Sequence, residues 1–188
     1  KEALISAKKN NVPIILDPVG ASATKIRLDS SLYYLKNYPI NVIKGNYSEI
    51  YSIYNKKLTT KGVDSLSINK EELIEISQAL STMYNIIVVA TGKEDIISYK
   101  DQTLLLKNGC KDLAKVTGTG CMLGAIIAAC TSFEMSIEAI ALAISIMNIS
   151  AERASKSKGM ASFKLSLLDE ISLVNKEKLK ERIVYERL

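Results

Sequence analysis

A glycine-rich turn in the second half of the sequence is the feature best suited to chemistry. Residues 115–124 read Lys-Val-Thr-Gly-Thr-Gly-Cys-Met-Leu-Gly, and the turn opens directly into an apolar segment with a helical pattern. Such a turn aims backbone N–H groups at one point, and the helix dipole adds to the preference for an anion. We therefore predict a phosphate site at this turn.

The turn differs from the two best-known phosphate loops. The sequence contains no G-x-x-x-x-G-K-[ST] motif, and Leu123 stands where G-x-G-x-x-G needs its last glycine. Cys121 falls in the first turn of the predicted helix, where the dipole favours a thiolate. It is either a reactive thiol or a small buried hydrophobic residue, and composition alone favours the second. We interpret Cys110 and Cys130 as structural.

Polar residues also follow three short apolar runs that we predict to be strands. Asp17 follows residues 12–16, Lys44 with Glu49 follows residues 40–43, and Thr91 follows residues 86–90. In an open parallel sheet, ligands bind at the carboxyl ends of the strands. Two carboxylates, a lysine and a hydroxyl on one rim suit a hydrated Mg²⁺ and phosphates.

Each of these residues also has a structural interpretation. Asp17 precedes a proline and fits a turn, and Thr91 with Gly92 fits a surface turn. Asn46 and Glu49 have the spacing of a helix N-cap and its reciprocal acid, which is a capping box. Taken one at a time, the structural interpretations stay open, and only the convergence on one rim favours function.

The elements that must position these residues alternate along the chain. Helical patterns at residues 1–9, 29–37 and 69–84 are each followed by a short apolar run, as expected for a parallel sheet covered on both faces. The fold class is therefore α/β. Residues 96–99 and 103–106 are predicted to add an antiparallel hairpin at a sheet edge. In the helix at 69–84, the buried face is predicted to contain Leu73, Ile76, Leu80 and Met83.

The rest of the chain is predicted to be helical and to belong to the same domain. Two apolar helices are expected at residues 121–131 and 136–156, and a solvated terminal helix at 175–188. We see no linker or repeat that would divide the chain, so residues 1–188 are predicted to form a single domain. The uncharged stretch 116–133 is interpreted as a loop with a buried helix, because it opens with Thr117-Gly118-Thr119-Gly120 and is followed by Glu134. We therefore expect no membrane span.

Composition excludes several functional classes. Histidine is absent, which removes Ser-His-Asp and Cys-His nucleophiles and imidazole zinc sites. The three cysteines contain no C-x-x-C pair, which indicates neither a disulfide framework nor a zinc ribbon and favours a reducing, cytoplasmic setting. The net charge of +5 suits a phosphate-bearing ligand, but the basic residues are scattered, so we expect no nucleic-acid partner.

Five motifs in register give the sequence a resemblance to a known family. They are Leu16-Asp17-Pro18-Val19-Gly20 with Ala23-Thr24-Lys25 and Arg27, Ile43-Lys44-Gly45-Asn46-Tyr47-Ser48-Glu49-Ile50, Gly62-Val63-Asp64-Ser65, Val89-Ala90-Thr91-Gly92-Lys93-Glu94-Asp95, and Thr117-Gly118-Thr119-Gly120-Cys121. Their order and spacing resemble hydroxyethylthiazole kinase, a ribokinase-like family, over nearly the whole chain. The cysteine after Gly-Thr-Gly is the discriminating residue, because related ribokinase-like enzymes usually carry Asp there as the general base.

This resemblance implies a fold, an activity and roles for particular residues. The fold would be a ribokinase-like, three-layer α/β/α kinase domain with a mostly parallel central sheet. The activity would be ATP-dependent phosphorylation of the hydroxyl of 4-methyl-5-(2-hydroxyethyl)thiazole in thiamine biosynthesis and salvage, by a homotrimer. By position, Asp17 and Glu49 would coordinate Mg²⁺, directly or through water, and Lys44 and Thr91 would contact the ATP phosphates.

In the same resemblance, the glycine turn would surround the transferring phosphoryl group. Gly118, Thr119, Gly120 and Cys121 would form the anion hole, and Gly120 would also lie near the substrate alcohol. Cys121 would be the catalytic residue beside the attacking hydroxyl. Whether the thiol takes the proton or only shapes the pocket stays open, because a loose phosphoryl-transfer transition state demands little of a base.

Two departures from the family pattern lead to further expectations. The family usually has Arg where this chain has Lys44, so a bidentate fork becomes a point charge and nucleotide binding should weaken. The family's N-terminal portion, which supplies most of the thiazole pocket, is not in this sequence, so a protein of these residues only is expected to bind nucleotide at best, without turnover. The alternatives are a related kinase for another small heterocyclic alcohol and a non-catalytic nucleotide-binding fragment.

Overall fold

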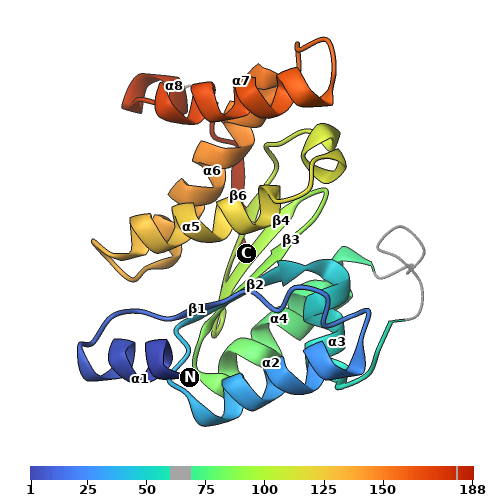
Figure 1. The fold of residues 1–188 in the computed structure, drawn as a ribbon, viewed down its shortest axis with the longest axis vertical. Coiled ribbons are helices and arrows are strands. Elements are labelled where there is room, and N and C mark those ends of the chain that lie inside the picture. Colours follow the sequence, from blue (N-terminus) through green and yellow to red (C-terminus); the bar gives the residue numbers. More distant parts are fainter. Residues whose placement is uncertain (60–68, 181) are drawn as a thin grey trace. The chain divides into compact units, whose positions relative to one another are not determined.

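A computed structural model describes residues 1–59, 69–180 and 182–188 of the chain (Figure 1). Its strands form a sheet in the order β1-β2-β3-β4-β5-β6, and the chain divides into two compact units. The first unit comprises Lys1–Gly92, Ile96–Leu104 and Leu188, and the second comprises Lys93–Asp95 and Leu105–Arg187. The motif Gly62-Val63-Asp64-Ser65 lies outside the described residues.

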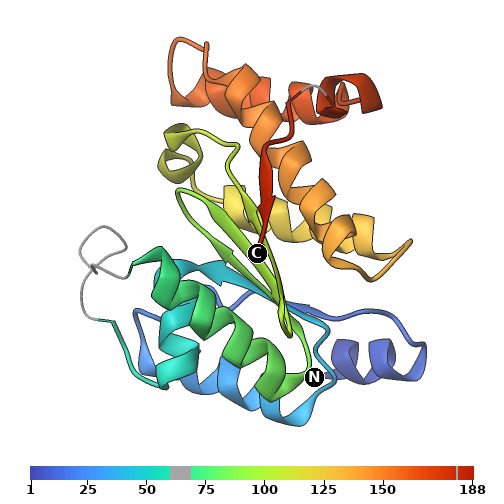
Figure 2. The same cartoon turned by 180° about the vertical axis from the view of Figure 1, so that it is seen from behind.

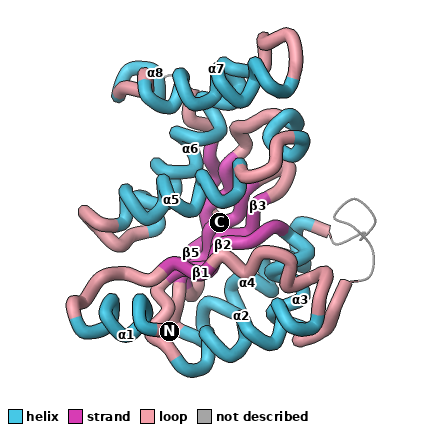
Figure 3. The backbone as a smooth tube through the Cα atoms, viewed as in Figure 1, coloured by secondary structure: helices cyan, strands magenta, loops and turns pink. Residues whose placement is uncertain are grey.

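Helices and strands alternate through most of the first unit (Figure 3). In chain order its elements are α1 (Glu2–Lys9), β1 (Ile15–Leu16), α2 (Lys25–Asn37), β2 (Val42–Asn46), α3 (Tyr47–Asn55), α4 (Lys70–Tyr84) and β3 (Ile87–Thr91). The pairs β1–β2 and β2–β3 are parallel. Helix α3 packs against β2 and helix α4 against β3, with α2 beside α3 (Figure 2). The predicted α/β class is confirmed.

The register of the parallel strands brings their carboxyl ends together. Gly45 is paired with Ala90 and Asn46 with Thr91, while Leu16 of β1 is paired with Ile43. The strand interiors have no solvated side, which explains the unbroken apolar runs in the sequence. Asp17 therefore follows β1 and Thr91 ends β3 at one edge of the parallel part of the sheet, whereas Lys44 was predicted to follow its strand but lies within β2.

The two strands of the predicted hairpin are present, but they do not end the sheet as predicted, because β6 lies beyond β5 in the strand order. β4 (Asp95–Tyr99) runs antiparallel to β3 and neighbours β5 (Gln102–Leu106). The tail was predicted to be a terminal helix, and this is wrong for its last residues. A short helix α8 (Lys176–Lys180) is followed by β6 (Tyr185–Arg187), which neighbours β5. All three residues of β6 are exposed, so the tail lacks the apolar alternation by which a strand is usually recognised.

Helix α4 forms where it was predicted, but its buried face differs. Met83 has a side chain that is 58% exposed, so the prediction that it faces the core is wrong. The buried positions are Leu73, Ile76, Ser77, Leu80 and Ser81, which follow the spacing of one helical face. Ser77 and Ser81 are small polar residues on this buried face. A prediction that counts only apolar residues misses them and includes Met83 instead.

The second unit is built around a long helix. Its elements include the 3₁₀ helix η2 (Lys111–Lys115) and the helices α5 (Thr119–Thr131), α6 (Ile137–Ala154), α7 (Met160–Ser172) and α8. Helix α6 packs against α5, α7 and α8. Helix α7 was not predicted, although buried Phe163 and Leu167 have helical spacing. No helix in the described ranges is long and apolar enough to cross a membrane.

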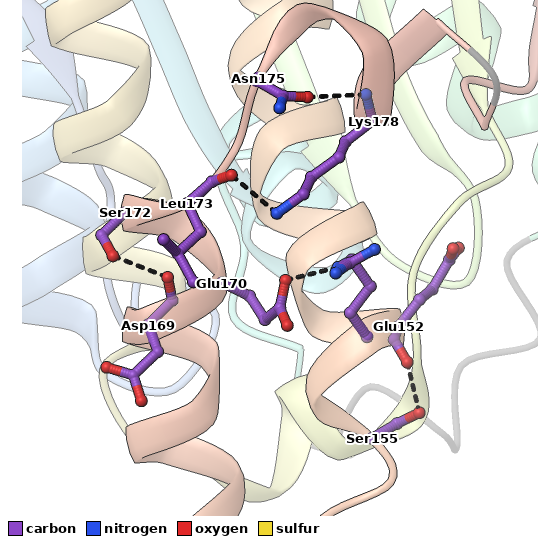
Figure 4. A network of polar contacts seen from close by, with 9 residues as sticks. Glu152, Ser155, Asp169, Glu170, Ser172, Leu173, Asn175 and Lys178 are labelled. Carbon is purple, nitrogen blue, oxygen red and sulfur yellow. Dashed lines mark hydrogen bonds and ion pairs between the residues drawn. The ribbon is translucent and has the colours of Figure 1, made fainter.

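Polar contacts join α6, α7 and the corner that follows α7 (Figure 4). Arg153 of α6 forms an ion pair with Glu170 of α7. At the corner, the Lys178 ammonium donates a hydrogen bond of 2.8 Å to the carbonyl oxygen of Leu173, and the Asn175 side chain accepts the Lys178 N–H at 2.9 Å. These contacts fix where α8 begins.

Candidate functional site

An ion pair links the ends of β1 and β2 in the first unit. The Lys44 ammonium lies 2.8 Å from Asp17 Oδ2, and the lysine side chain is only 4% exposed. Asp17 retains 23% exposure, so its carboxylate is the more accessible member of the pair. Lys44 lies within the buried strand β2, and its charge is balanced there by the carboxylate of Asp17, which follows β1.

Glu49 fastens the turn after β1 to the start of helix α3. Its Oε1 accepts the Gly20 N–H and its Oε2 accepts the Asn46 N–H, each at 2.8 Å. The Asn46 side chain accepts the Glu49 N–H at 2.9 Å, which completes the predicted capping box. Gly20 has a φ of +73°, a conformation that favours glycine. Glu49 is thus both a structural cap and a rim residue.

Thr91 lies at the end of β3 and is tied to the same strand end. Its hydroxyl donates a hydrogen bond of 3.3 Å to the Gly45 carbonyl oxygen. The Tyr47 ring covers Gly92, because a Cβ built on Gly92 would lie 2.4 Å from Tyr47 Cζ. The structure therefore places the predicted rim residues within one unit: Asp17 and Lys44 form an ion pair, and Glu49 and Thr91 are bonded to backbone groups at the ends of β1 and β2.

The donor set of this rim fits a magnesium ion that keeps most of its water. In the described part of the chain, no group of three or more Asp, Glu, Cys or His side chains could hold a metal. Glu49 is 8% exposed and uses both oxygens on N–H groups, although a carboxylate offers about four lone-pair positions in all. Asp17 is the accessible carboxylate. Mg²⁺ bound through one or two carboxylates, waters and phosphates matches this set.

The glycine turn begins helix α5 in the second unit. Gly118 is the N-cap residue and has a φ of +99°, which places it in the left-handed region. A Cβ built there would meet no heavy atom of the described chain within 4 Å, so space is open beside the turn. No side chain caps the N-terminus of α5. Open space in front of a helix N-terminus suits the predicted anion.

The side chain of Thr119 forms hydrogen bonds with the backbone that precedes the glycine turn. Its hydroxyl lies 2.9 Å from the carbonyl oxygen of Leu113 and 3.1 Å from that of Val116. Leu113 belongs to η2, so this hydroxyl ties the start of α5 to the 3₁₀ helix that precedes it. Within the predicted anion hole, Thr119 could therefore offer only its backbone N–H to a ligand.

The three cysteines differ in their surroundings. Cys121 is exposed, so the interpretation of this residue as a small buried hydrophobe is wrong. The stripe Leu123, Ile127 and Thr131 is the buried part of α5, and Cys121 lies off it. Cys130 is half-buried, and burial raises the pKa of its thiol. Cys110 is also half-buried and its thiol lies 3.5 Å from the Ala151 carbonyl oxygen.

Two residues of the sequence motifs that were given no role of their own contribute to the rim. Gly20 donates the N–H that Glu49 accepts, and its place after Asp-Pro-Val is the signal that could have identified it. The contact of Tyr47 with Gly92 joins residues on different elements, and nothing in their spacing indicates it.

Comparison with known proteins gives consistent results along the chain. Residues 1–177 match the model of the hydroxyethylthiazole kinase family. A hydroxyethylthiazole kinase from Finegoldia magna is 48% identical over 183 residues, which cover 97% of this chain and 68% of the relative. Hydroxyethylthiazole kinase 2 from Clostridium botulinum is 42% identical, with 96% of this chain and 69% of the relative covered.

Solved structures support the same assignment. The hydroxyethylthiazole kinase protein from Pyrococcus horikoshii has a TM-score of 0.89 at 30% identity, covering all of this chain and 70% of its own. A Bacillus subtilis putative kinase of the UPF0031 family has a TM-score of 0.60 at 20% identity over 88% of this chain and 57% of its own, and it shows the fold alone. The predicted ribokinase-like α/β fold and the predicted kinase family are confirmed. The chain belongs to the hydroxyethylthiazole kinase family.

Proposed function

We propose that this chain transfers the γ-phosphoryl group of ATP to the hydroxyl of 4-methyl-5-(2-hydroxyethyl)thiazole, a step in thiamine biosynthesis and salvage. The observation that carries the proposal is the family match over residues 1–177. The rim of the first unit and the glycine turn of the second supply the two kinds of group that phosphoryl transfer needs, which are charge neutralisation and positioning.

The rim residues hold the nucleotide in this proposal. Asp17 and Glu49 would hold Mg²⁺, directly or through water, and the bound ion would neutralise phosphate charge. Thr91 offers its hydroxyl to a phosphate oxygen. The Lys44 ammonium donates to Asp17 and its side chain is only 4% exposed, so contact with a phosphate requires this buried side chain to shift outward. That requirement makes Lys44 a weaker phosphate contact than an accessible cation.

The glycine turn receives the transferring group. The backbone N–H groups from Gly118 to Cys121 form the anion hole in this proposal, where the dipole of α5 adds to their attraction. Gly120 lies near the substrate alcohol in this proposal, and its lack of a side chain leaves room for the thiazole ring. Cys121, which is exposed, lies beside the attacking hydroxyl.

The assembly and setting are further parts of the proposal. We propose that residues 1–188 form a single kinase domain, that the enzyme is a homotrimer in the cytoplasm, and that Mg²⁺ accompanies ATP. The homotrimer and the cytoplasmic setting rest on family resemblance and on unpaired cysteines. Size-exclusion chromatography with light scattering measures the oligomeric state directly.

The first experiment combines the intact mass of the purified protein with an ATP-consumption assay. The assay is run with Mg²⁺, with and without hydroxyethylthiazole, and with a hydroxymethylpyrimidine and a pyridoxal-like alcohol as competing acceptors. We expect ATP consumption by the intact protein to depend on the thiazole alcohol, and a protein of residues 1–188 only to bind nucleotide without turnover. Preference for another alcohol would reassign the substrate, while nucleotide binding without any turnover at a mass of 20.6 kDa would identify a binding fragment.

A further inference from the structure

A tight corner lies between strand β5 and the 3₁₀ helix η2 in the second unit. Its residues are Asn108 and Gly109, and Gly109 has a φ of +131°, which L side chains rarely adopt. The chain continues from this corner through Cys110 and η2 into the glycine turn. The position of the corner therefore sets where the turn begins.

Helix α6 holds this corner with side chains from successive turns. Glu152 Oε1 accepts the Gly109 N–H at 2.7 Å and an Asn108 side-chain N–H at 3.1 Å. Asn148 donates one amide N–H to the Asn108 carbonyl oxygen at 2.8 Å and the other to Asp95 Oδ2 at 2.7 Å. Asn148 is 4% exposed and Asp95 is 6% exposed, so the hydrogen bond between them is buried. We call the contacts of Glu152 and Asn148 with the corner the clamp.

The corner is also held from the C-terminal segment. The Asn108 side chain donates to the Arg182 carbonyl oxygen at 2.9 Å, and its own oxygen accepts the Val184 N–H at 2.7 Å. The backbone and side chain of Asn108 are thus bound to α6 on one side and to the tail on the other.

The Glu152 carboxylate accepts two N–H groups, and its hydrogen bonds are charge-assisted, which makes them stronger than those of a neutral acceptor.

Contacts continue from the corner to the turn without a gap. The Cys110 thiol lies 3.5 Å from the Ala151 carbonyl oxygen of α6, next along the chain from the corner. Thr119 then ties the start of α5 back to Leu113 in η2 at 2.9 Å. Each link lies within the second unit, so the backbone N–H groups of the turn are positioned by a continuous series of contacts that starts on α6.

From this series we infer that Glu152 is a positioning residue for the anion hole, acting through the Asn108–Gly109 corner. This inference rests on the proposed function, because only there does the glycine turn bind the transferring phosphoryl group. A turn whose N–H groups are fixed before the phosphoryl group arrives stabilises the transition state without reorganisation. Loosening the corner should therefore lower kcat far more than it raises KM for ATP.

The test compares Glu152→Ala with Glu152→Gln and with Ser155→Ala. Glutamine keeps an oxygen that can accept both N–H groups, and Ser155 perturbs the same end of α6 through its contact with the Glu152 carbonyl oxygen at 2.6 Å (Figure 4). We expect Glu152→Ala to lower kcat about tenfold with KM for ATP changed less than about twofold, because donors must sit within a fraction of an ångström. Glu152→Gln should recover most of the loss, and Ser155→Ala should match the parent protein.

Hydrogen exchange provides a readout that does not need turnover. Amides of residues 110–121 should exchange about tenfold faster in Glu152→Ala than in the parent, while those of α4 should not change. Equal exchange in the two proteins, or a loss of kcat without faster exchange at these amides, would overturn the inference. Absence of thiazole-dependent turnover in the parent would count against the proposed function, and the exchange result would still decide the role of Glu152.

Discussion

Replacing Glu49 by glutamine tests whether the rim depends on one carboxylate. In the structure, each oxygen of Glu49 accepts a backbone N–H at 2.8 Å, one from Gly20 and one from Asn46. Glutamine keeps one acceptor oxygen and turns an NH₂ group toward the second N–H. One charge-assisted bond is then lost, and a buried donor faces another donor.

The expected cost follows from the burial of the group. Glu49 is 8% exposed, so water cannot readily replace the lost acceptor. Hydrogen bonds to charged groups contribute about 1.5–3 kcal/mol, and an unsatisfied buried N–H costs about 1–3 kcal/mol. Allowing for relaxation, we expect Glu49→Gln to lower the free energy of unfolding by about 2–4 kcal/mol, which is a large part of the total stability of a typical domain.

A matched control exists on helix α4. Glu72 has the same position relative to its N-cap Asn69, whose side chain accepts the Glu72 N–H at 2.6 Å, but Glu72 is exposed. Glu72→Gln should therefore change the free energy of unfolding by less than about 0.5 kcal/mol. Urea unfolding followed by far-UV circular dichroism measures both variants. If the two costs agree within about 1 kcal/mol, the reasoning that assigns Glu49 a bridging role is refuted.

Three further predictions concern the turn and the rim. Thiol alkylation near neutral pH should modify Cys121 before Cys130, because Cys121 is exposed and burial raises the pKa of the Cys130 thiol; mass spectrometry with time would show equal rates if this is wrong. Gly92→Ala should lower the free energy of unfolding by about 1–3 kcal/mol, because the Tyr47 ring must move to make room for the new methyl group. Adding Tyr47→Ala to this variant removes the clash and should restore part of the lost stability, as measured by thermal unfolding. Thr119→Val should cost about 1–2 kcal/mol and speed exchange at the turn, whereas Thr119→Ser should do neither, since a serine hydroxyl can make the same bonds.

The sequence predicted those parts of the fold in which one signal dominates. The buried strands are continuous apolar runs, and the spacing of Asn46 and Glu49 predicted a capping box that is present. Predictions went wrong where small polar residues take buried places, as Ser77 and Ser81 do on α4. Their size suits close packing, and Ser81 is satisfied by the Ile86 carbonyl oxygen at 2.7 Å, but neither property is visible in an apolar pattern.

The candidate site could be predicted as a set of residues but not as a set of contacts. The carboxyl ends of strands gave Asp17, Lys44 and Thr91, because topology alone brings such residues to one edge. That Lys44 is buried against Asp17 depends on side-chain packing across two strands, which the sequence does not encode in its spacing. The clamp on Gly109 by Glu152 joins residues far apart in the chain, and only the fold reveals it.

The short strand β6 has a consequence for the solubility of the chain. Beside it lies β5, whose residues Thr103–Leu106 are all buried and would form a flat apolar edge if unpaired. β6 covers that edge with three exposed residues, two of them charged, and Glu186 pairs with Lys107 at 2.8 Å. Charged, very short edge strands resist pairing with a second chain. The C-terminal segment thus protects the edge of β5 from pairing with a second chain, and its removal should increase edge-to-edge self-association.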